Sequence, residues 1–557
     1  MSATQNKSST AVVGKFVQGL KEAALSGNGK TFDSAAAGEF VSGAKSQNTA
    51  EIPEKLLKVL DEHDDKGQKR VISAILDSCK QYEYAHGRPA PADLIEQAIH
   101  SAYSATEEGR SLDSASSSHS EPTSLQANRT IVAIMAVTSE PVAYAHYLPV
   151  DLGSNEATLA ILTHQAGNDN GRYTVGQTMD GAASGDTYLS ASREHKCAIN
   201  AETGAIIGKL TAIQKTDDTC DPAGAAIKTL RGRSLVYVNG IICAREVSSS
   251  GTGASTVSGR ATITVDGVKI DYQISGTVNP DTGDINLLST PALPASNAVV
   301  VEGFLDYERS PALVPSIATG VETYTLHAKP WRAITSQTID ARTQMSNELG
   351  LDPHSEAIIA VQAQFANERQ YELLRKGKRI AQRNQETFDF KWETAGDFKV
   401  RADIFRDMGG PLNLLSQRMA LRTVNHGISD CYVGALLASY LVSLPNDMWE
   451  PSGVFERPGL YRLGRLHGRY NFYYSPKVVE ETETTAQILC VGRATDVTRN
   501  PVILGDAVAP IVMPLNPSLS PELAFNSGAA FYARGFTAIN PHEPSADGWA
   551  LLNITNL

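Results

Sequence analysis

The sequence has no cysteine framework and no long apolar run. Its six cysteines are scattered over 557 residues, with no CxxC pair and no histidine at metal-ligand spacing. This pattern excludes a disulfide scaffold and predicts reduced, buried thiols in a cytosolic protein. The longest apolar stretch, Tyr432–Leu444, is interrupted by Gly434 and closed by Pro445, so it predicts a core helix and not a membrane span. The first residues lack a continuous apolar segment, and no secretory signal is expected.

Positive charge is also scarce. The chain has 49 Lys and Arg against 61 Asp and Glu, a net charge of −12, which argues against binding nucleic acid through overall charge. A hydrophobic fraction of 42% excludes wholesale disorder, and ordinary Gly and Pro contents exclude collagen-like and low-complexity classes. At about 150 residues per domain, the length predicts three to four domains, or one large domain with insertions. Composition does not separate a large enzyme from a large structural protein.

The N-terminal part of the chain has a helical pattern with few large apolar residues. Apolar residues recur at helical spacing in Val12–Leu25, in Pro53–Lys80, where the charged turn Asp61–Gly67 divides two faces, and in Ala92–Ser104. The segment Ser111–Ser124 then has the composition of a linker. We therefore expect a separate helical appendage with a thin core.

The middle of the chain has the alternating pattern of β-strands. In Ala261–Val278, alternating residues flank Asp266-Gly267, which is a strong signal for a two-residue hairpin. Asn279–Gly283 predicts a second turn, and Ser248–Ser255 predicts an exposed loop tip.

Helical patterns return after residue 352. Asp352 is a suitable N-cap for a long helix that begins at Pro353 and is expected to end near Gly377. A second helix is expected to begin at Pro411 and to stop at Gly427. Strands and turns fill the chain from residue 459 onward, so the fold class is α+β and not alternating βαβ.

Three patterns could carry a ligand, and each has a simpler interpretation. Ala24–Thr31 fits a loose phosphate-loop pattern, but a helix precedes it where a strand is needed, which predicts a plain turn. The aspartates around Cys220 lack calcium-loop spacing and predict a solvated acidic turn; they are Asp217, Asp218 and Asp221. Arginines alternate with aromatic residues in Tyr461–Phe472, which favours a half-exposed strand at a subunit contact over a nucleic-acid platform; they are Arg462, Arg465 and Arg469.

No catalytic constellation is present in the sequence. There is no HExxH arrangement and no GxSxG elbow. Four histidines have no acidic residue at a spacing that would indicate a catalytic site; they are His195, His327, His426 and His467. We therefore expect no enzyme activity, no cofactor and no metal.

Four segments, in order, resemble a known family. They are Thr130–Pro149, an apolar strand leading into an extended arm; Thr338–Arg375, a polar lead-in and long helix; Gly459–Pro510, a Gly-rich strand pair that runs into GDAVAPIVMPL; and Phe525–Pro541, a closing strand with Asn-Pro. Together they resemble the major capsid proteins of tailed phages, in the T-even-like and large-phage branch with the HK97-like fold. The chain departs from that pattern at Arg493-Ala494, where Lys and Gly are expected, and at residues 508–510, where aromatic residues are usual.

The resemblance implies an α+β, HK97-like capsid fold with a peripheral domain carrying a long spine helix, an axial domain, an extended loop and an N-terminal arm. The β-rich stretch is too long for an extended loop alone, which indicates an inserted β domain, either an outward decoration or an elaborated loop. The expected parts are a helical appendage (1–125), the arm and start of the peripheral domain (126–172), the extended loop with inserted β domain (173–325), the spine-helix region (326–410), the axial domain (411–458), and the closing strands (459–557).

The resemblance also implies a function and partners. It implies a non-enzymatic shell subunit that assembles into hexameric capsomers and encloses double-stranded DNA, located in the virion after assembly in the bacterial cytoplasm. Implied partners are further copies of the chain, a vertex protein, a portal, a scaffold, a maturation protease and decoration proteins, with no membrane. The alternatives are a pentameric vertex protein, an encapsulin-like compartment and, remotely, a β-rich hydrolase.

Many relatives lose an N-terminal segment to a protease that cuts after a glutamate. In this chain Glu39 and Glu121 stand near suitable places, although Pro122 is a poor residue to follow a cleaved bond. We therefore expect an assembly segment at the N-terminus, with or without removal after Glu39 or Glu121.

Overall fold

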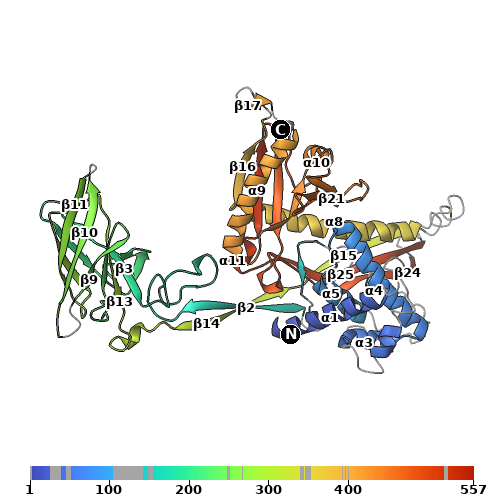
Figure 1. Ribbon diagram of the computed structural model, residues 1–557. Helices are drawn as coiled ribbons and strands as arrows, with labels where there is room; N and C mark the ends of the chain where they lie inside the picture. Colours follow the sequence, from blue (N-terminus) through green and yellow to red (C-terminus); the bar gives the residue numbers. More distant parts are fainter. Residues whose placement is uncertain are drawn as a thin grey trace. The chain divides into compact units, whose positions relative to one another are not determined.

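The computed structural model has two compact units. Unit 1 comprises Met1–Ile161 and Thr323–Leu557, and unit 2 comprises Leu162–Glu322. The fold mixes helices and strands, as the sequence predicts (Figure 1). None of the described helices is long and apolar enough to cross a membrane. The structure describes residues 3–24, 39–44, 52–104, 134, 142–148, 150, 155–247, 251–265, 268–338, 344, 353–391, 393–394, 397–398, 401–519 and 525–557.

Unit 2 is a β-rich unit around one sheet. Its described strands follow the order β3-β13-β8-β9-β10-β11-β12-β5-β4. Alternate residues of these strands, such as Ile274, Ile285 and Val301, point into one buried cluster, which is the pattern expected for an antiparallel sheet with one solvated face. The bounds are β3 Ser192–Lys196, β4 Ala198–Ile199, β5 Ala205–Lys209, β6 Gln214–Thr216, β7 Thr219–Cys220, β8 Leu235–Val238, β9 Ile241–Glu246, β10 Ser255–Val265, β11 Val268–Val278, β12 Asp284–Thr290 and β13 Val299–Phe304.

The predicted hairpins of unit 2 are confirmed by strand register. β10 and β11 pair continuously down to Val265 opposite Val268, and Asp266-Gly267 between them lies outside the described residues. The next turn has Gly283 at a φ of +76°, a backbone conformation that glycine adopts without strain, and β12 begins at the following residue. The β-rich segment predicted from the sequence covers residues 173–325, and the compact unit runs Leu162–Glu322.

Unit 1 is built on a sheet that is buried on both faces. The described strands follow the order β16-β26-β23-β19-β22-β21-β20. Neighbouring residues alternate between two clusters: Cys431 and Phe472 point to one side, Tyr432 and Tyr473 to the other. Helices α9 and α10 lie beside this sheet (Figure 1). The bounds are β16 Gln385–Asp389, β19 Ile428–Val433, β20 Trp449–Pro451, β21 Tyr461–Leu466, β22 Tyr470–Tyr474, β23 Thr485–Gly492, β26 Trp549–Thr555, α9 Arg401–Thr423, α10 Ala435–Val442 and α11 Glu543–Ala546, with a short pair β17 Glu393–Thr394 and β18 Asp397–Phe398.

Helix α9 corrects the expected start at Pro411. The helix begins at Arg401 and contains Pro411, so the predicted division of the chain between residues 410 and 411 falls inside one helix. Six side chains on both sides of the proline are buried in a single cluster: Ile404, Phe405, Met408, Leu412, Leu415 and Met419. Their burial, at about 1.5–3 kcal/mol each, exceeds the cost of about 3 kcal/mol for an internal proline.

The apolar stretch 432–444 is not one helix, which is a second correction. Its first residues complete strand β19, and α10 begins only after Gly434. The Glu481 carboxylate accepts hydrogen bonds from the backbone N–H groups of Leu436 and Leu437, both at 2.9 Å, and so caps the helix. A β-carbon at position 434 would lie 2.5 Å from that carboxylate, which explains why glycine stands between strand and helix.

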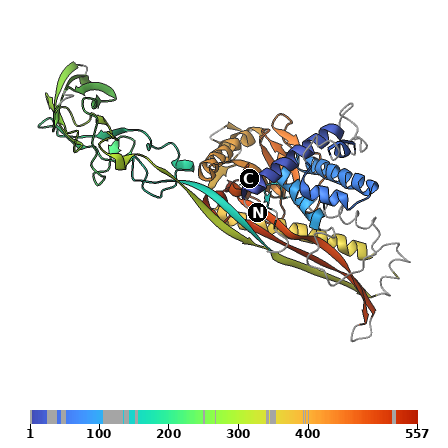
Figure 2. The same cartoon turned by 90° about the horizontal axis from the view of Figure 1, so that it is seen from below.

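A second sheet of unit 1 carries the long helix α8. The described strands follow the order β1-β24-β25-β15, and α8 lies along the long strands (Figure 2, yellow helix beside red strands). The helix does not end near Gly377, as the sequence predicted. It continues to Ala381, because Gly377 is a point of close contact with the Trp549 ring and not a helix end. The bounds are β1 His146–Tyr147, β15 Lys329–Thr338, α8 Pro353–Ala381, β24 Val502–Leu519 and β25 Phe525–Ile539.

Gly377 gives a direct test of this packing. A β-carbon at this position would lie 2.4 Å from Trp549 ring atoms, so Gly377→Ala should destabilise the protein by about 1–3 kcal/mol through overpacking. In α9, a β-carbon at Gly409 would make only an ordinary contact, 3.4 Å from His467 Nε2, and Gly409→Ala should stabilise by up to about 1 kcal/mol through helix propensity. Urea denaturation of both variants measures the difference. Equal changes in the free energy of unfolding for the two substitutions would contradict the close contact between Gly377 and the Trp549 ring.

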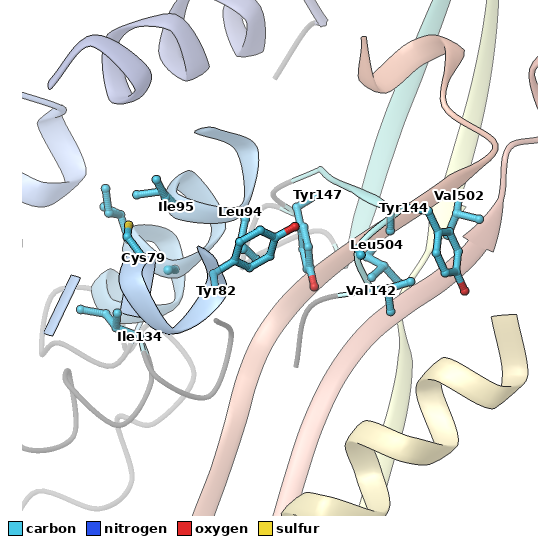
Figure 3. Close-up of a cluster of buried hydrophobic side chains, with 14 of the residues drawn as sticks. Cys79, Tyr82, Leu94, Ile95, Ile134, Val142, Tyr144, Tyr147, Val502 and Leu504 are labelled. Atoms are coloured by element: carbon cyan, nitrogen blue, oxygen red, sulfur yellow. The ribbon is translucent and has the colours of Figure 1, made fainter. Parts of the chain in front are cut away.

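The N-terminal helices correct the prediction of a separate appendage. Figure 3 shows Cys79, Tyr82, Leu94 and Ile95 from these helices in one cluster with Val502 and Leu504 of β24. The helices are poor in large apolar residues, and they complete their core by packing on the rest of unit 1. The expected turn in Asp61–Gly67 is confirmed, with Asp64 capping the second of two helices. The bounds are α1 Ala3–Ala24, α3 Glu54–Asp61, α4 Asp65–His86 and α5 Ala92–Ser104.

Candidate assembly surface

Strand β15 presents an open edge in unit 1. It pairs with β25 from Lys329 opposite Gly535 to Thr338 opposite Asn526, and within the described residues no strand pairs with its other side. An open edge leaves backbone N–H and C=O groups available to another chain. Ile334, in the middle of the strand, is 74% exposed. An apolar side chain on an open edge is a feature that monomeric proteins avoid, and it indicates a surface for association.

One face of β15 packs against α8. The Trp331 and Phe365 rings meet edge to face at 5.3 Å, and Phe365 meets Phe531 of β25 at 5.2 Å. Alternate residues such as Arg332 and Ile334 therefore face solvent while Trp331 faces the helix. The contacts of Trp331 with α8 therefore fix the position of the strand whose edge is open.

Two ion pairs reinforce the attachment of α8. Glu372 of α8 pairs with Lys329 of β15 at 2.7 Å, and within the helix it also pairs with Lys376 at 2.6 Å. Deeper in the sheet, the Arg369 guanidinium donates to the Asp506 carboxylate of β24 at 2.7 Å, with the two side chains 4% and 6% exposed. A short, buried and charge-assisted pair of this kind defines one register of the helix on the sheet.

The chain enters and leaves unit 2 through a two-stranded ribbon. It is formed by β2 (Glu156–Ala166) and β14 (Ile317–His327). Most residues of β14 are exposed on both faces. Three exposed residues of the ribbon are apolar: Leu162 of β2 at 59%, and Ile317 and Val321 of β14 at 52% and 58%. An isolated two-stranded ribbon is marginal in water, so partner contacts are expected to cover it in an assembly.

Of the two glutamates predicted as cleavage sites, one lies within the described residues. Glu39 is exposed at the start of a short helix, residues 39–44, whose Val41 and Ala44 are buried. Glu121 lies outside the described residues, as does most of the phosphate-loop-like segment, since α1 ends at Ala24. Cleavage after either glutamate stays a prediction.

The other residues that the sequence indicated as candidates do not lie together in one site. His195 accepts a bond from the Cys220 N–H at 3.2 Å, His327 pairs with Glu156 at 3.2 Å, and His426 is buried. Asp217 is paired with Arg172 at 2.7 Å. In the part of the chain that the structure describes, no group of three or more His, Cys, Asp or Glu side chains could hold a metal ion.

The basic-aromatic strand differs from the prediction at one position. Arg465 is half-buried as expected, with its guanidinium near Glu450 at 3.9 Å. Arg462 is not half-exposed: it is 6% exposed. The pairing of β21 with β22 shifts between Arg462 and Gly464, and with this shift Arg462 lies opposite Tyr473, on the buried face that carries Tyr432 and Tyr473.

A polar cluster that the sequence analysis missed ties α5 to the second sheet. The Asp93 carboxylate lies 3.2 Å from His146 Nδ1 and 3.2 Å from the Arg493 guanidinium, and it accepts the Tyr147 N–H at 2.9 Å. Burial alone would raise the pKa of Asp93, but His146, Arg493 and the Tyr147 N–H together lower it to about 2. Arg493 is a position where the sequence departs from the resembled family. The cluster therefore gives that departure a structural role.

The comparisons with known proteins find similarity among solved structures. No protein-family model matches the chain, and no curated protein matches it. Among solved structures, a chain of the jumbo bacteriophage PhiKZ capsid matches with 9% identity and a TM-score of 0.37, over 74% of this chain and 91% of that one. The capsid of Myoviridae phage XM1 matches with 9% identity and a TM-score of 0.28, over 44% and 78%. The chain is similar to phage capsid proteins.

A further match is an encapsulin. An encapsulin complex from Synechococcus elongatus matches with 10% identity and a TM-score of 0.27, over 43% of this chain and 78% of that chain.

Proposed function

We propose that this chain is the major structural subunit of an icosahedral phage head. In this proposal many copies assemble into hexameric capsomers that enclose double-stranded DNA, in the virion, after assembly in the bacterial cytoplasm. The observation that carries the proposal is the open edge of β15, which exposes Ile334 while its other face is fixed on α8. Edges of this kind pair with neighbouring chains, and repeated head-to-tail pairing closes into rings.

Two further observations support a shell subunit. The four segments that resemble tailed-phage capsid proteins occur in the order expected for that family, and the second of them covers most of α8, the long helix expected there. The net charge of −12 suits a container that must lie beside DNA without gripping it. A vertex protein, a portal, a scaffold, a maturation protease and decoration proteins are the partners that this role would require. In this role the N-terminal segment would act in assembly.

Assembly of the purified chain tests the proposal. At high concentration the wild-type protein should form shells, tubes or hexameric rings, seen by negative-stain microscopy and light scattering. Ile334→Lys should block assembly, because a lysine on an edge strand prevents edge-to-edge pairing. Its free energy of unfolding should change by less than about 0.5 kcal/mol, since the side chain is exposed.

Ile334→Val is the matched control and should assemble like the wild type, because it keeps an apolar, β-branched residue on the edge. A wild-type chain that stays monomeric at high concentration would overturn the shell function. An Ile334→Lys variant that assembles as well as the wild type would overturn the role of this edge.

A further inference from the structure

Among the described residues, Arg462 is a buried arginine without a carboxylate partner. The residue is 6% exposed, and its Nε is buried with no hydrogen-bond partner. The nearby carboxylates are engaged elsewhere: Asp430 with Arg88 at 3.4 Å, and Glu450 with Arg465 at 3.9 Å. In the described part of the chain no carboxylate forms an ion pair with Arg462. A buried charge without a partner is costly, so this one needs an explanation.

The backbone is shaped to hold this guanidinium in place. The register shift after Arg462 sends Leu463 into the cluster beneath α9 and leaves Arg462 on the opposite side of the sheet. Gly87, the left-handed cap of α4, makes room for it. A β-carbon at Gly87 would lie 2.1 Å from Arg462 Nη1 and 2.4 Å from Cζ. The guanidinium therefore occupies a space that any larger residue at position 87 would fill.

The guanidinium borders a cavity. The cavity has a volume of about 280 Å³, and its wall combines aromatic rings with two arginines: Tyr82, Tyr144, Tyr461, Tyr473, Arg457 and Arg462. The Tyr144 hydroxyl is buried and has no hydrogen-bond partner. Two unsatisfied donor groups thus line one space that is large enough for a small molecule.

The charge around the cavity is positive. Asp430 is fully buried, and its oxygens lie near Arg88, the Ser429 hydroxyl and the Asn471 amide. The His86 side chain adds neither positive nor negative charge to the cavity. Burial, followed by the charges of Arg88, Arg462 and Arg457, lowers the pKa of His86 to about 3, so the imidazole is neutral at pH 7. The cavity therefore has an excess of cationic donors over anionic acceptors.

We propose that this cavity is a binding site for a small oxyanion, a phosphate or a carboxylate. The Arg462 guanidinium would donate to two oxygens of the anion, which is the geometry that arginine favours, and Arg457 and the Tyr144 hydroxyl would supply further positive charge and a donor. The bound anion would neutralise the buried charge. The site stands independently of the shell function, because it lies within one copy of unit 1.

The test compares Arg462→Met with a matched control, Arg465→Gln, on the same strand. Melting temperatures are measured at pH 7 and constant ionic strength in chloride, acetate and inorganic phosphate, and binding of the two oxyanions is measured by calorimetry. The wild type should bind phosphate or acetate and melt at a higher temperature in its presence. Arg462→Met should weaken that binding by about tenfold or more, the value of a lost charge-assisted hydrogen bond. Arg465→Gln should bind as the wild type does.

A second readout separates a ligand site from a structural role. In chloride, Arg462→Met should melt at or above the wild-type temperature, because it removes an unpaired buried charge and keeps the packing volume. A lower melting temperature would indicate that Arg462 stabilises the fold itself, and it would overturn the proposal. Failure of the wild type to bind either oxyanion, or equal binding by Arg462→Met, would also overturn it. Binding of phosphate alone or of acetate alone identifies which oxyanion the site takes.

Discussion

Arg369→Met is expected to lower the free energy of unfolding by about 3–5 kcal/mol, because it leaves the buried Asp506 carboxylate without its partner. The two side chains are 4% and 6% exposed, so water cannot replace the lost bond. The loss should appear in urea denaturation as a shift of the midpoint with an unchanged slope. It should also loosen α8 from β24, the strand that pairs with β25 behind the β15 edge.

Two controls make this prediction specific. Arg369→Met combined with Asp506→Leu should restore most of the stability, because an apolar pair of similar volume needs no buried charge balance. Glu543→Gln removes a partner of Arg383 in an exposed pair, with side chains 58% and 75% exposed, and should change stability by less than about 1 kcal/mol. A loss of under about 1 kcal/mol in Arg369→Met would mean that the pair does not fix the helix.

A large pH effect is expected from His86. Its pKa is about 3 in the folded chain, against 6.5 ordinarily, because burial and the surrounding arginines disfavour the imidazolium. The unfolded chain therefore binds one more proton than the folded chain between about pH 3 and pH 6.5. Stability falls as the pH decreases through this window, by about 1.4 kcal/mol per unit and about 5 kcal/mol in all, and is fully present above pH 7.

The measurement is the difference between the wild type and His86→Phe over pH 4 to 7 in phosphate-free buffer. Phenylalanine keeps an aromatic ring beside Tyr82, where the ring centroids are 4.6 Å apart, and does not titrate. The gap between the two unfolding free energies should change with pH as described. Parallel curves would show that His86 is protonated equally in both states. The groups that face its ring are Arg88, Arg457, Arg462, Arg493 and the Tyr473 hydroxyl.

Local signals in the sequence predicted much of the fold. The two-residue hairpin and the Asn279–Gly283 turn follow from residue types that the backbone conformation requires, so their register was predictable. Helix ends were predicted less well. Gly377 and Pro411 have the residue types of a helix end and a helix start, yet both lie inside helices. The reason is tertiary: Trp549 packs against one, and a continuous buried face spans the other.

The candidate sites were harder to predict because they depend on long-range contacts. Arg462 lies in a strand whose alternation predicted exposure, and only the register shift at Leu463 reverses its direction. The Asp93–His146–Arg493 cluster joins residues 400 positions apart. One signal was present in the sequence, since Arg493 replaces a residue expected from the resembled family.

The ribbon that leads into unit 2 has a consequence for how the chain can vary. The Gly167 N–H donates to the Ser316 carbonyl at 2.7 Å, so the two ends of the intervening 148 residues are already joined. Closing a loop costs little more when the loop is lengthened, about 0.6 kcal/mol for each doubling. Whatever sequence lies between these two residues, whether a short turn or a whole folded domain, the strands that lead to it can keep the same pairing. Unit 2 is therefore a replaceable module, and position 167 is a natural place at which to graft foreign sequence.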